Sequence, residues 1–380
     1  MRDRFLLRPG VVFLNHGSFG ACPVPVFEAY QRWQRELEGQ PVEFLGRRSP
    51  ELLRAARAAL GAFVGADPDD LVYVPNATAG VNAVARSLEL RPGDEVVGTD
   101  HEYGAEERTW QAACAERGAR YVRAAVPVPV RSRDEVVEQI WSAVTPRTRV
   151  LAVSHITSPT ALILPVGELI GRARAEGILT VIDGAHAPGQ IPLDLRRLGA
   201  DFYAANCHKW MCAPKGTGFL FARADLKDRL RPPVTSWGDA REAAGPSHFL
   251  NEFEWQGTED ISRYLAVPEA IRFLREHDWE AVRARAHVLV RRFREAVARL
   301  AGSAPLCPDD EGWYAQMASM PLPVPVEEAP ALQRRLYDEF AVEIPLMRWN
   351  GRTLLRISVQ AYNTAGDVDM LLRALERVLR

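Results

Sequence analysis

The sequence contains no apolar run close to the roughly 20 residues that a membrane-spanning helix needs. Residues 1–10 also lack the apolar core and the small-residue cleavage site of a secretory leader. The formal net charge of −2 gives no positive excess that would favour nucleic acid or an anionic membrane as a partner. We therefore expect a cytoplasmic protein that binds neither.

Lysine and cysteine are both scarce. Three of the 47 basic residues are lysines, a bias that fits a GC-rich genome or a warm habitat and does not bear on function. The five cysteines form an odd and scattered set, which argues against a disulfide framework. Cys207 and Cys212 lie close together, but no second pair accompanies them, so we interpret both as packing residues and predict no metal site.

What the sequence does contain is a regular alternation of short apolar runs and helical patterns. Its 380 residues suffice for one large domain and a smaller one, and 47% hydrophobic and 25% charged residues are ordinary for a globular protein. The alternation predicts an α/β fold with a mainly parallel sheet and right-handed crossovers. We expect an N-terminal segment over residues 1–30, a large domain over 31–275 and a small α+β domain over 276–380.

Buried strands are expected where the apolar runs are short, at residues 71–74, 94–98, 119–126, 149–154, 179–182, 200–205 and 218–222. The helical patterns lie at residues 29–37, 51–63, 81–88, 131–144, 166–176, 260–276 and 279–300. In the small domain we expect antiparallel strands at residues 313–320, 342–345 and 353–359, with helices at 332–340 and 366–379.

Residues 178–218 contain two neighbouring apolar runs that both end in polar residues. Asp183 follows the first run, and Asn206, His208 and Lys209 follow the second. Because ligands in open α/β sheets bind beyond the carboxyl ends of the strands, we expect these side chains to meet. A lysine and a carboxylate there suit pyridoxal 5′-phosphate (PLP), since the lysine forms a Schiff base and the carboxylate keeps the pyridine nitrogen protonated. Taken singly, such an Asp is more often a cap and such a Lys a solvated charge.

The order of these residues resembles a known family. The pattern consists of Asp183, His186, His208, Lys209 and the glycine-rich stretch Pro214-Lys215-Gly216-Thr217-Gly218. It resembles the class V aminotransferases, a group of fold-type I PLP enzymes that includes cysteine desulfurases and isopenicillin N epimerase. The resemblance covers residues 14–364 and implies PLP as the cofactor. It also implies the fold-type I transferase architecture, with a seven-stranded-type sheet in the large domain.

Within that group, the sequence is most similar to the isopenicillin N epimerase-like branch. The loop Asn15-His16-Gly17-Ser18-Phe19-Gly20 is characteristic of that branch. In the family this loop borders the substrate pocket, which implies that Asn15 and His16 bind the substrate. The residues alone indicate only a tight loop, because they combine two glycines with an Asn and a Ser.

The phosphate of the cofactor is expected at the turn after the first strand of the large domain. There a strand passes through small residues into a helix, whose free N–H groups and positive dipole end suit an anion. In the family this turn is the phosphate cup, which implies roles for Ala77 and Thr78, with Asn206 and His208 beside them. Gly257-Thr258 resembles the segment that reaches the phosphate in the neighbouring subunit, which implies a homodimer.

Other residues are expected around the cofactor ring. The resemblance implies that His186 contacts the phenolic oxygen, and Ser158 stands where many cysteine desulfurases have an Asn with that role. A flat side chain over the ring is expected after residues 94–98. His101 matches the T-D-H form of that motif and Tyr103 the H-E-Y-G-A form, and both remain open.

Arg356 lies within an otherwise apolar strand pattern. An arginine is rarely buried unpaired, and its forked guanidinium suits a carboxylate. In the family an arginine in this R-I-S-x-x-x-Y-N-T pattern grips the α-carboxylate of the substrate. The alternative is a structural salt bridge.

These parts would make Lys209 a base beside Cα of an amino-acid substrate, with Asp183 and His186 as its catalytic partners. Three outcomes remain open: epimerisation, β-elimination from an S-substituted cysteine or its sulfoxide (a C–S lyase), and transamination. We expect the isopenicillin N epimerase-like reaction. A non-catalytic scaffold with this fold is the alternative from another class.

Desulfuration is disfavoured, since it needs a nucleophilic cysteine before the strand of Arg356 and residues 344–352 contain none. An epimerase needs an acid on the face of Cα opposite Lys209. The candidates for that acid are His16, His101, Tyr103 and Tyr264.

Overall fold

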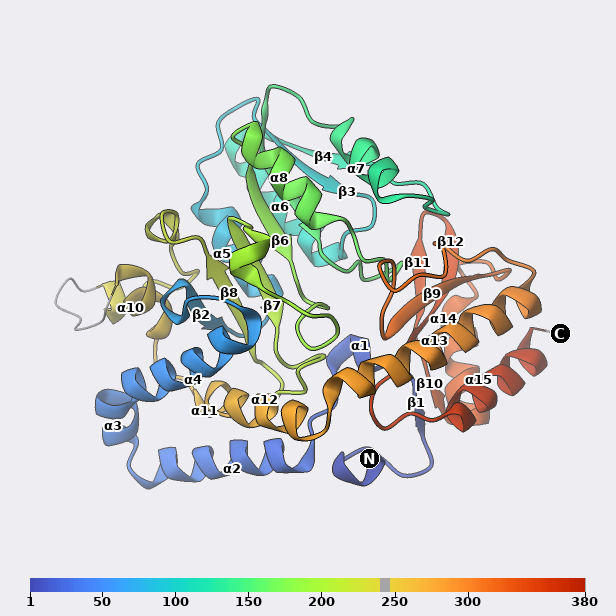
Figure 1. The fold of residues 1–380 in the computed structure, drawn as a ribbon. Coiled ribbons are helices and arrows are strands. Elements are labelled where there is room, and N and C mark those ends of the chain that lie inside the picture. The colour runs from blue at the N-terminus through green and yellow to red at the C-terminus, as the bar shows by residue number, and fades with distance from the viewer. Residues whose placement is uncertain (240–246, 380) are drawn as a thin grey trace.

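The computed structural model describes residues 1–239 and 247–379 of the chain (Figure 1). Its largest sheet has seven strands, which are β2 (Leu71–Val74), β3 (Glu95–Thr99), β4 (Arg120–Ala124), β5 (Thr148–Ser154), β6 (Leu179–Asp183), β7 (Phe202–Asn206) and β8 (Gly218–Ala222). Their order across the sheet is β2-β8-β7-β6-β5-β3-β4. All neighbours from β7 to β4 run parallel, whereas β8 is antiparallel to both of its neighbours. The predicted α/β fold with a mainly parallel sheet is confirmed.

Helices cover both faces of this sheet, so its strands are buried on both sides. Along β7, Phe202 and Ala204 belong to one hydrophobic cluster and Tyr203 and Ala205 to the other, because successive side chains of a strand point to opposite faces. The first cluster includes residues of α5 (Ala77–Ser87), α6 (Gly104–Arg117) and α10 (His248–Glu254). The second includes residues of α4 (Ser49–Val64), α8 (Val166–Ala175) and α12 (Val267–Glu276).

The C-terminal part of the chain forms a second, three-stranded antiparallel sheet. Its strands are β9 (Met317–Leu322), β11 (Leu346–Trp349) and β12 (Arg352–Ser358), in the order β11-β12-β9. Around it pack α13 (Trp279–Ala301), α14 (Ala329–Phe340) and α15 (Ala365–Val378). In Figure 1 the long helix α13 runs from beside α12 to this sheet and thus spans both parts of the molecule.

One expected strand pairs differently from the prediction. Residues 342–345 were expected in an antiparallel sheet, but β10 (Val342–Glu343) pairs in parallel with β1 (Val12–Phe13). Leu14 N donates to Glu343 O at 2.9 Å. The antiparallel prediction is wrong because this two-residue strand finds its partner at the other end of the chain. The N-terminal segment therefore packs against the C-terminal part, and the domain boundaries at residues 30 and 275 stay proposals.

Several helices also differ from their predicted ends. α5 begins at Ala77 instead of residue 81, because Asn76 Oδ1 accepts a hydrogen bond from Ala79 N at 2.9 Å and caps the first turn. The expected helix over residues 260–276 is divided into α11 (Ser262–Leu265) and α12. Sequence patterns did not predict α6. The remaining short or covering helices are α1 (His16–Phe19), α2 (Val24–Gly39), α3 (Pro41–Glu43), α7 (Arg133–Trp141) and α9 (Leu195–Leu198).

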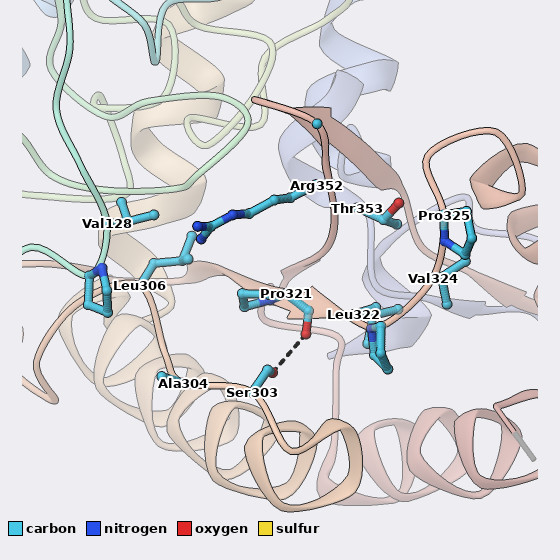
Figure 2. A pocket seen from close by; sticks show the side chains of 13 residues that line it. Val128, Ser303, Ala304, Leu306, Pro321, Leu322, Val324, Pro325, Arg352 and Thr353 are labelled. Atoms are coloured by element: carbon cyan, nitrogen blue, oxygen red, sulfur yellow. Dashed lines mark hydrogen bonds between the residues drawn. The ribbon is translucent and has the colours of Figure 1, made fainter.

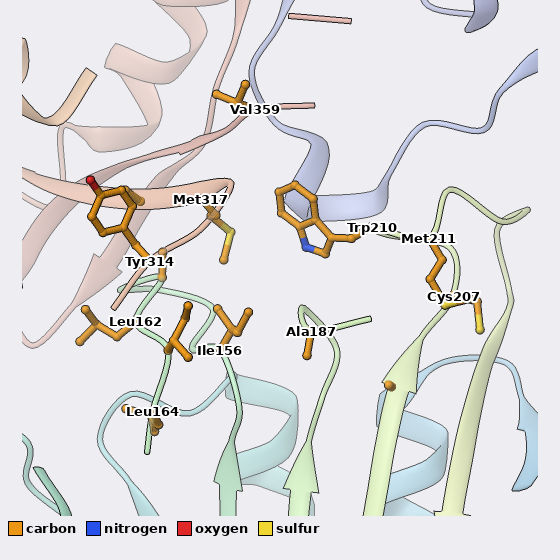
Figure 3. Packing of buried hydrophobic residues seen from close by; sticks show 14 of the residues in the cluster. Ile156, Leu162, Leu164, Ala187, Cys207, Trp210, Met211, Tyr314, Met317 and Val359 are labelled. Carbon is orange, nitrogen blue, oxygen red and sulfur yellow. The ribbon is translucent and has the colours of Figure 1, made fainter. Parts of the chain in front are cut away.

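Trp210 marks the place where the two parts of the chain meet. Figure 3 shows its indole beyond the ends of the large-sheet strands, with Met317 and Val359 of the C-terminal part nearby. All three are fully buried in one hydrophobic cluster. Cys207 and Cys212 belong to the same cluster, in agreement with a packing role. None of the helices that the structure describes has the length and apolar character of a membrane span.

Candidate active site

Lys209 and His186 form the central pair of the site. Lys209 Nζ lies 3.1 Å from His186 Nε2, and the Trp210 indole N–H donates to His186 Nδ1 at 3.2 Å. Because Nδ1 accepts that bond, we assign the proton of the neutral imidazole to Nε2, from which it donates to the lone pair of a neutral amine. Burial, and then the charge of Arg356, lower the pKa of Lys209 to about 8. The surroundings of Lys209 thus favour the nucleophilic form of its amine.

Asp183 ends β6, next to β7 and the loop that carries Lys209. It is buried, and its Oδ1 accepts a hydrogen bond from Ala185 N at 2.8 Å. Burial raises the pKa of this carboxyl, while the Ala185 N–H and the Lys209 charge lower it. A buried carboxylate without a salt bridge among residues 1–239 and 247–379 fits a cationic ligand group, such as a protonated pyridine nitrogen.

The start of α5 has the form of an anion-binding turn, with one change from the expected roles. Asn206 Oδ1 accepts a hydrogen bond from Ala77 N at 2.8 Å, so this N–H is already used within the protein. Asn206 therefore stabilises the turn through this hydrogen bond. Within the described part of the chain, the Thr78 hydroxyl has no protein partner, and its N–H lies in the first turn, where helices leave donors free. Thr78 is thus the residue best placed to hold a phosphate.

His208 lies beside this turn with one ring nitrogen engaged. Its Nδ1 donates to Thr217 O at 3.0 Å, which leaves Nε2 for a ligand. Burial, and then the Lys209 charge, lower the pKa of His208 to about 4. A phosphate dianion beside Nε2 would oppose this shift by favouring the charged imidazolium.

Arg356 on β12 is buried without an acidic partner. Nη1 donates to Ser158 O at 2.8 Å and to Ser158 Oγ at 3.0 Å, and Nη2 donates to Ser18 Oγ at 3.1 Å. Its Nε has no partner, and no carboxylate of the described residues pairs with it. The structural salt bridge considered above is therefore not formed within this part of the chain. A buried guanidinium held by two serines is suited to take up a carboxylate.

The N-terminal loop joins Arg356 to the backbone of Lys209. His16 Nε2 lies 3.0 Å from Lys209 O and Nδ1 lies 2.9 Å from the Tyr362 hydroxyl, so both ring nitrogens are occupied. Burial lowers the pKa of His16 to about 3. Asn15 is likewise engaged, with Glu343 at 3.1 Å. These contacts fit positioning roles better than the expected substrate contacts, and the sequence prediction overlooked Ser18.

Gly20 ends this loop in a conformation that favours glycine. Its φ is +72°, and a Cβ at this position would lie 2.0 Å from His208 O. The second glycine of the loop is thus needed for its close approach to the lysine-bearing segment. Figure 1 shows the resulting place of α1, between the large sheet and the small one.

The two candidates for the ring-facing side chain differ in their surroundings. His101 is completely buried, with Nδ1 2.7 Å from Thr160 Oγ1 and Nε2 2.7 Å from Val126 O. Tyr103, in contrast, is 49% exposed, and its hydroxyl acts on the pKa of Arg356. Among the described residues, Tyr103 is thus the candidate whose side chain is not already engaged within the protein.

The remaining predicted residues are Tyr264, Ser158 and Thr258. Tyr264 stacks on Tyr73 with ring centroids 4.9 Å apart, and its hydroxyl accepts from Arg263 at 2.9 Å. Ser158 contacts Arg356, as described above, so it lies on the substrate side of the site. Thr258 is exposed in the single chain, next to Gly257 with φ of +121°. Among the described residues, no group of His, Cys, Asp and Glu side chains could hold a metal ion.

A separate hollow of about 540 Å³ lies between the end of α13 and β12 (Figure 2). Arg352 extends across it toward Val128, and prolines line much of its wall. None of the residues predicted for the site contributes to it, so its size does not make it the catalytic pocket.

Comparisons with known proteins support the PLP interpretation. The family model described as "Aminotransferase class-V" matches residues 12–325. The chain is 38% identical over 389 residues to the isopenicillin N epimerase of Amycolatopsis lactamdurans, which covers 99% of this chain and 97% of the relative. It is 28% identical over 409 residues to the L-cysteine desulfhydrase of Arabidopsis thaliana. That match covers 98% of this chain and 88% of the relative.

Solved structures show the same fold. The chain superposes on C-DES with glycine covalently linked to its PLP cofactor, with a TM-score of 0.85, 22% identity and coverage of 99% of both chains. It also superposes on the cysteine desulfurase CsdA from Escherichia coli with a TM-score of 0.81 and 23% identity. This match covers 100% of the present chain and 97% of CsdA. The expectation that desulfuration is disfavoured gains no support from these neighbours. The family match indicates that PLP is the cofactor of this chain.

Proposed function

Because the chain belongs to the aminotransferase class V family, whose cofactor is PLP, we propose that it epimerises an amino-acid substrate at Cα. The 38% identity to an isopenicillin N epimerase over nearly the whole chain supports this choice. The observation that supports an amino-acid substrate is Arg356, whose buried guanidinium has hydroxyl and carbonyl partners but no acidic one among the described residues. A substrate carboxylate would supply the missing charge.

Each side chain then has a defined task. Bound through Lys209, PLP supplies an electron sink for the charge that develops at Cα. Arg356 holds the α-carboxylate, and Asp183 holds the proton on the ring nitrogen. Burial and the Arg356 charge favour the neutral Lys209 amine, and the Nε2–H of His186 orients it, so that this amine takes the Cα proton from one face.

Tyr103 is proposed to return a proton on the other face. Three of the four acids considered have their polar atoms engaged within the protein: His16, His101 and Tyr264. No hydrogen bond of the Tyr103 hydroxyl exists within the described part of the chain, and Tyr103 acts electrostatically on the pKa of Arg356. The same phenol would cover the cofactor ring. Tyr103 would then be both the ring-facing side chain and the second acid, the two roles that the sequence left open.

A C–S lyase is the second candidate. The 28% identity to an L-cysteine desulfhydrase supports it. The same Lys209 and Arg356 would serve, with the proton from Cα passed to the departing sulfur instead of back to carbon. Transamination would use the same residues, but neither of the two relatives named above is described as an aminotransferase.

We continue to regard desulfuration as the less favoured reaction. Burial raises the pKa of each of the five thiols, with Cys22 raised to about 12 and Cys307 to about 11. A nucleophilic cysteine needs the opposite shift. A non-catalytic scaffold is disfavoured because Lys209, Asp183, His208 and Arg356 are all present, whereas a decayed site would be expected to lose one of them.

We also propose that the enzyme is a cytoplasmic homodimer in which Thr258 reaches the phosphate at the neighbouring site. The exposure of Thr258 in the single chain supports a role across an interface.

Proton NMR in deuterated water tests the proposed reaction. L-amino acids and S-substituted cysteines are incubated with the holoenzyme and with its Lys209→Ala variant. Deuterium at Cα together with the opposite stereoisomer, absent in the variant, supports epimerisation. Pyruvate and ammonia from the cysteine derivatives, without the other stereoisomer, would identify a C–S lyase instead.

A further inference from the structure

Two glutamates, the half-buried Glu102 and the buried Glu106, lie next to Asp183 and are not used in the steps above. Glu102 and Glu106 line one small cavity together with Asp183, Trp110 and Val153. Its volume is about 10 Å³, close to the room that one water molecule needs. The loop after β3 supplies Glu102, and the first turn of α6 supplies Glu106.

Glu102 is surrounded by donors. Its Oε1 accepts from the Thr99 hydroxyl at 2.6 Å and from Thr99 N at 3.3 Å, and its Oε2 accepts from the Ser154 hydroxyl at 2.5 Å. Both oxygens of this carboxyl are therefore engaged as acceptors. Glu102 does not need the cavity to satisfy its hydrogen bonds.

Glu106 has the opposite surroundings. It is 4% exposed, and its Oε1 has no partner among the described residues. Burial and the charges of Asp183 and Glu102 raise its pKa well above the ordinary value for a glutamate. The Tyr121 hydroxyl is also buried and without a partner in the described chain, and it interacts electrostatically with both glutamates. Three carboxyl groups in so little space cannot all be charged.

We propose that Glu106 is a positioning residue that holds a proton and, through one buried water in this cavity, hydrogen-bonds to the Asp183 carboxylate. A neutral donor satisfies Asp183 without adding negative charge. It thereby lowers the affinity of Asp183 for the proton that must stay on the cofactor's ring nitrogen. The inference rests on the proposed role of Asp183 but not on whether the enzyme is an epimerase or a lyase.

Infrared spectroscopy of the holoenzyme tests whether Glu106 holds a proton. The wild type should show the carbonyl stretch of a protonated carboxyl group at neutral pH, and Glu106→Gln should lose it. Glu116→Gln is the matched control, because Glu116 belongs to the same helix but its side chain is 70% exposed. If Glu106→Gln leaves the protonated-carboxyl band unchanged, the proposal is wrong.

Nitrogen-15 NMR with PLP labelled at the ring nitrogen tests the effect on Asp183. Glu106→Gln, which keeps an N–H donor, should retain the protonated ring signal, and Glu106→Leu should shift it toward the unprotonated one. Asp183→Asn serves as the reference for an unprotonated ring. If Asp183→Asn itself leaves the signal unchanged, the role of Asp183 fails. If only Glu106→Leu leaves it unchanged, the present proposal alone is overturned. Should Glu106→Leu not fold, the infrared comparison still decides.

Discussion

The Ser18 hydroxyl accepts a hydrogen bond from Nη2 of Arg356 at 3.1 Å, although 338 positions separate the two residues. Ser158 and Ser18 thus both accept hydrogen bonds from the guanidinium of Arg356. This guanidinium has no carboxylate partner among the described residues. The N-terminal loop that carries Ser18 also touches Lys209 O through His16. The carboxylate-binding arginine and the cofactor-binding lysine are thus linked by one short loop.

Arg356→Leu should lower kcat/KM for the amino-acid substrate by about ten- to a hundredfold, because a charge-assisted hydrogen bond of about 1.5–3 kcal/mol is lost. The corresponding amino-acid amide, which lacks the carboxylate, should be turned over equally by both proteins. Arg352→Leu is the control, since Arg352 lies on the same strand, is exposed and faces the separate hollow of Figure 2. Equal losses in both variants would contradict the proposed role.

The pKa of about 8 at Lys209 predicts the pH dependence of cofactor loading. Only the neutral amine attacks PLP, and this amine loses its proton near pH 8 instead of near ~10.4, the value for an unperturbed lysine. Rates of reconstitution of the apoenzyme, followed by absorbance from pH 6 to 10, should therefore rise with a midpoint near 8. A midpoint near pH ~10 would show that the pKa of Lys209 is not lowered.

Tyr103→Phe separates the two steps of the proposed epimerisation. The variant keeps a flat ring but has no phenolic proton, so Cα deuteration should persist while the opposite stereoisomer forms at least ~100-fold more slowly. Tyr264→Phe is the matched control, because the Tyr264 hydroxyl is bonded to Arg263. Normal epimerisation by Tyr103→Phe would remove Tyr103 as the second acid.

Two buried neutral histidines should make the fold sensitive to acid. Burial lowers the pKa of His16 to about 3 and of His155 to about 4, below the ~6.5 of an unfolded histidine. At these two positions the unfolded chain binds more protons below pH 6.5, so the contribution of both histidines to stability falls as pH decreases from 6.5 toward 4. From pH 6.5 to 5 each histidine should contribute a loss of about 1.6 kcal/mol, measured by urea unfolding. His155→Asn should reduce this loss, whereas the exposed control His248→Asn should not. An identical pH dependence of stability in the wild type and in His155→Asn would exclude this effect.

The strand-end residues could be predicted from the sequence, because the break from apolar to polar residues is visible in one dimension. Asp183 and Asn206 end β6 and β7, and Lys209 follows, as the two apolar runs indicated. The pairing of β10 with β1 could not be predicted, since strands of two residues have no pattern that identifies a partner.

Burial of charged residues was the other failure of sequence reasoning. Sequence patterns did not single out Glu106, whose burial depends on how the start of α6 packs against β3. The choice between His101 and Tyr103 had the same origin, because two residues in one loop can point in opposite directions. Local pattern identifies strand ends but not the orientation of loop side chains.

The most direct test of the account uses the scarcity of lysine in this chain. The yellow holoenzyme is reduced with borohydride, digested and analysed by mass spectrometry, with three lysines to choose from: Lys209, Lys215 and Lys227. The account predicts a pyridoxyl group on Lys209 alone and none in Lys209→Ala. A pyridoxyl group on Lys215 or Lys227, or none on the wild type, would contradict it.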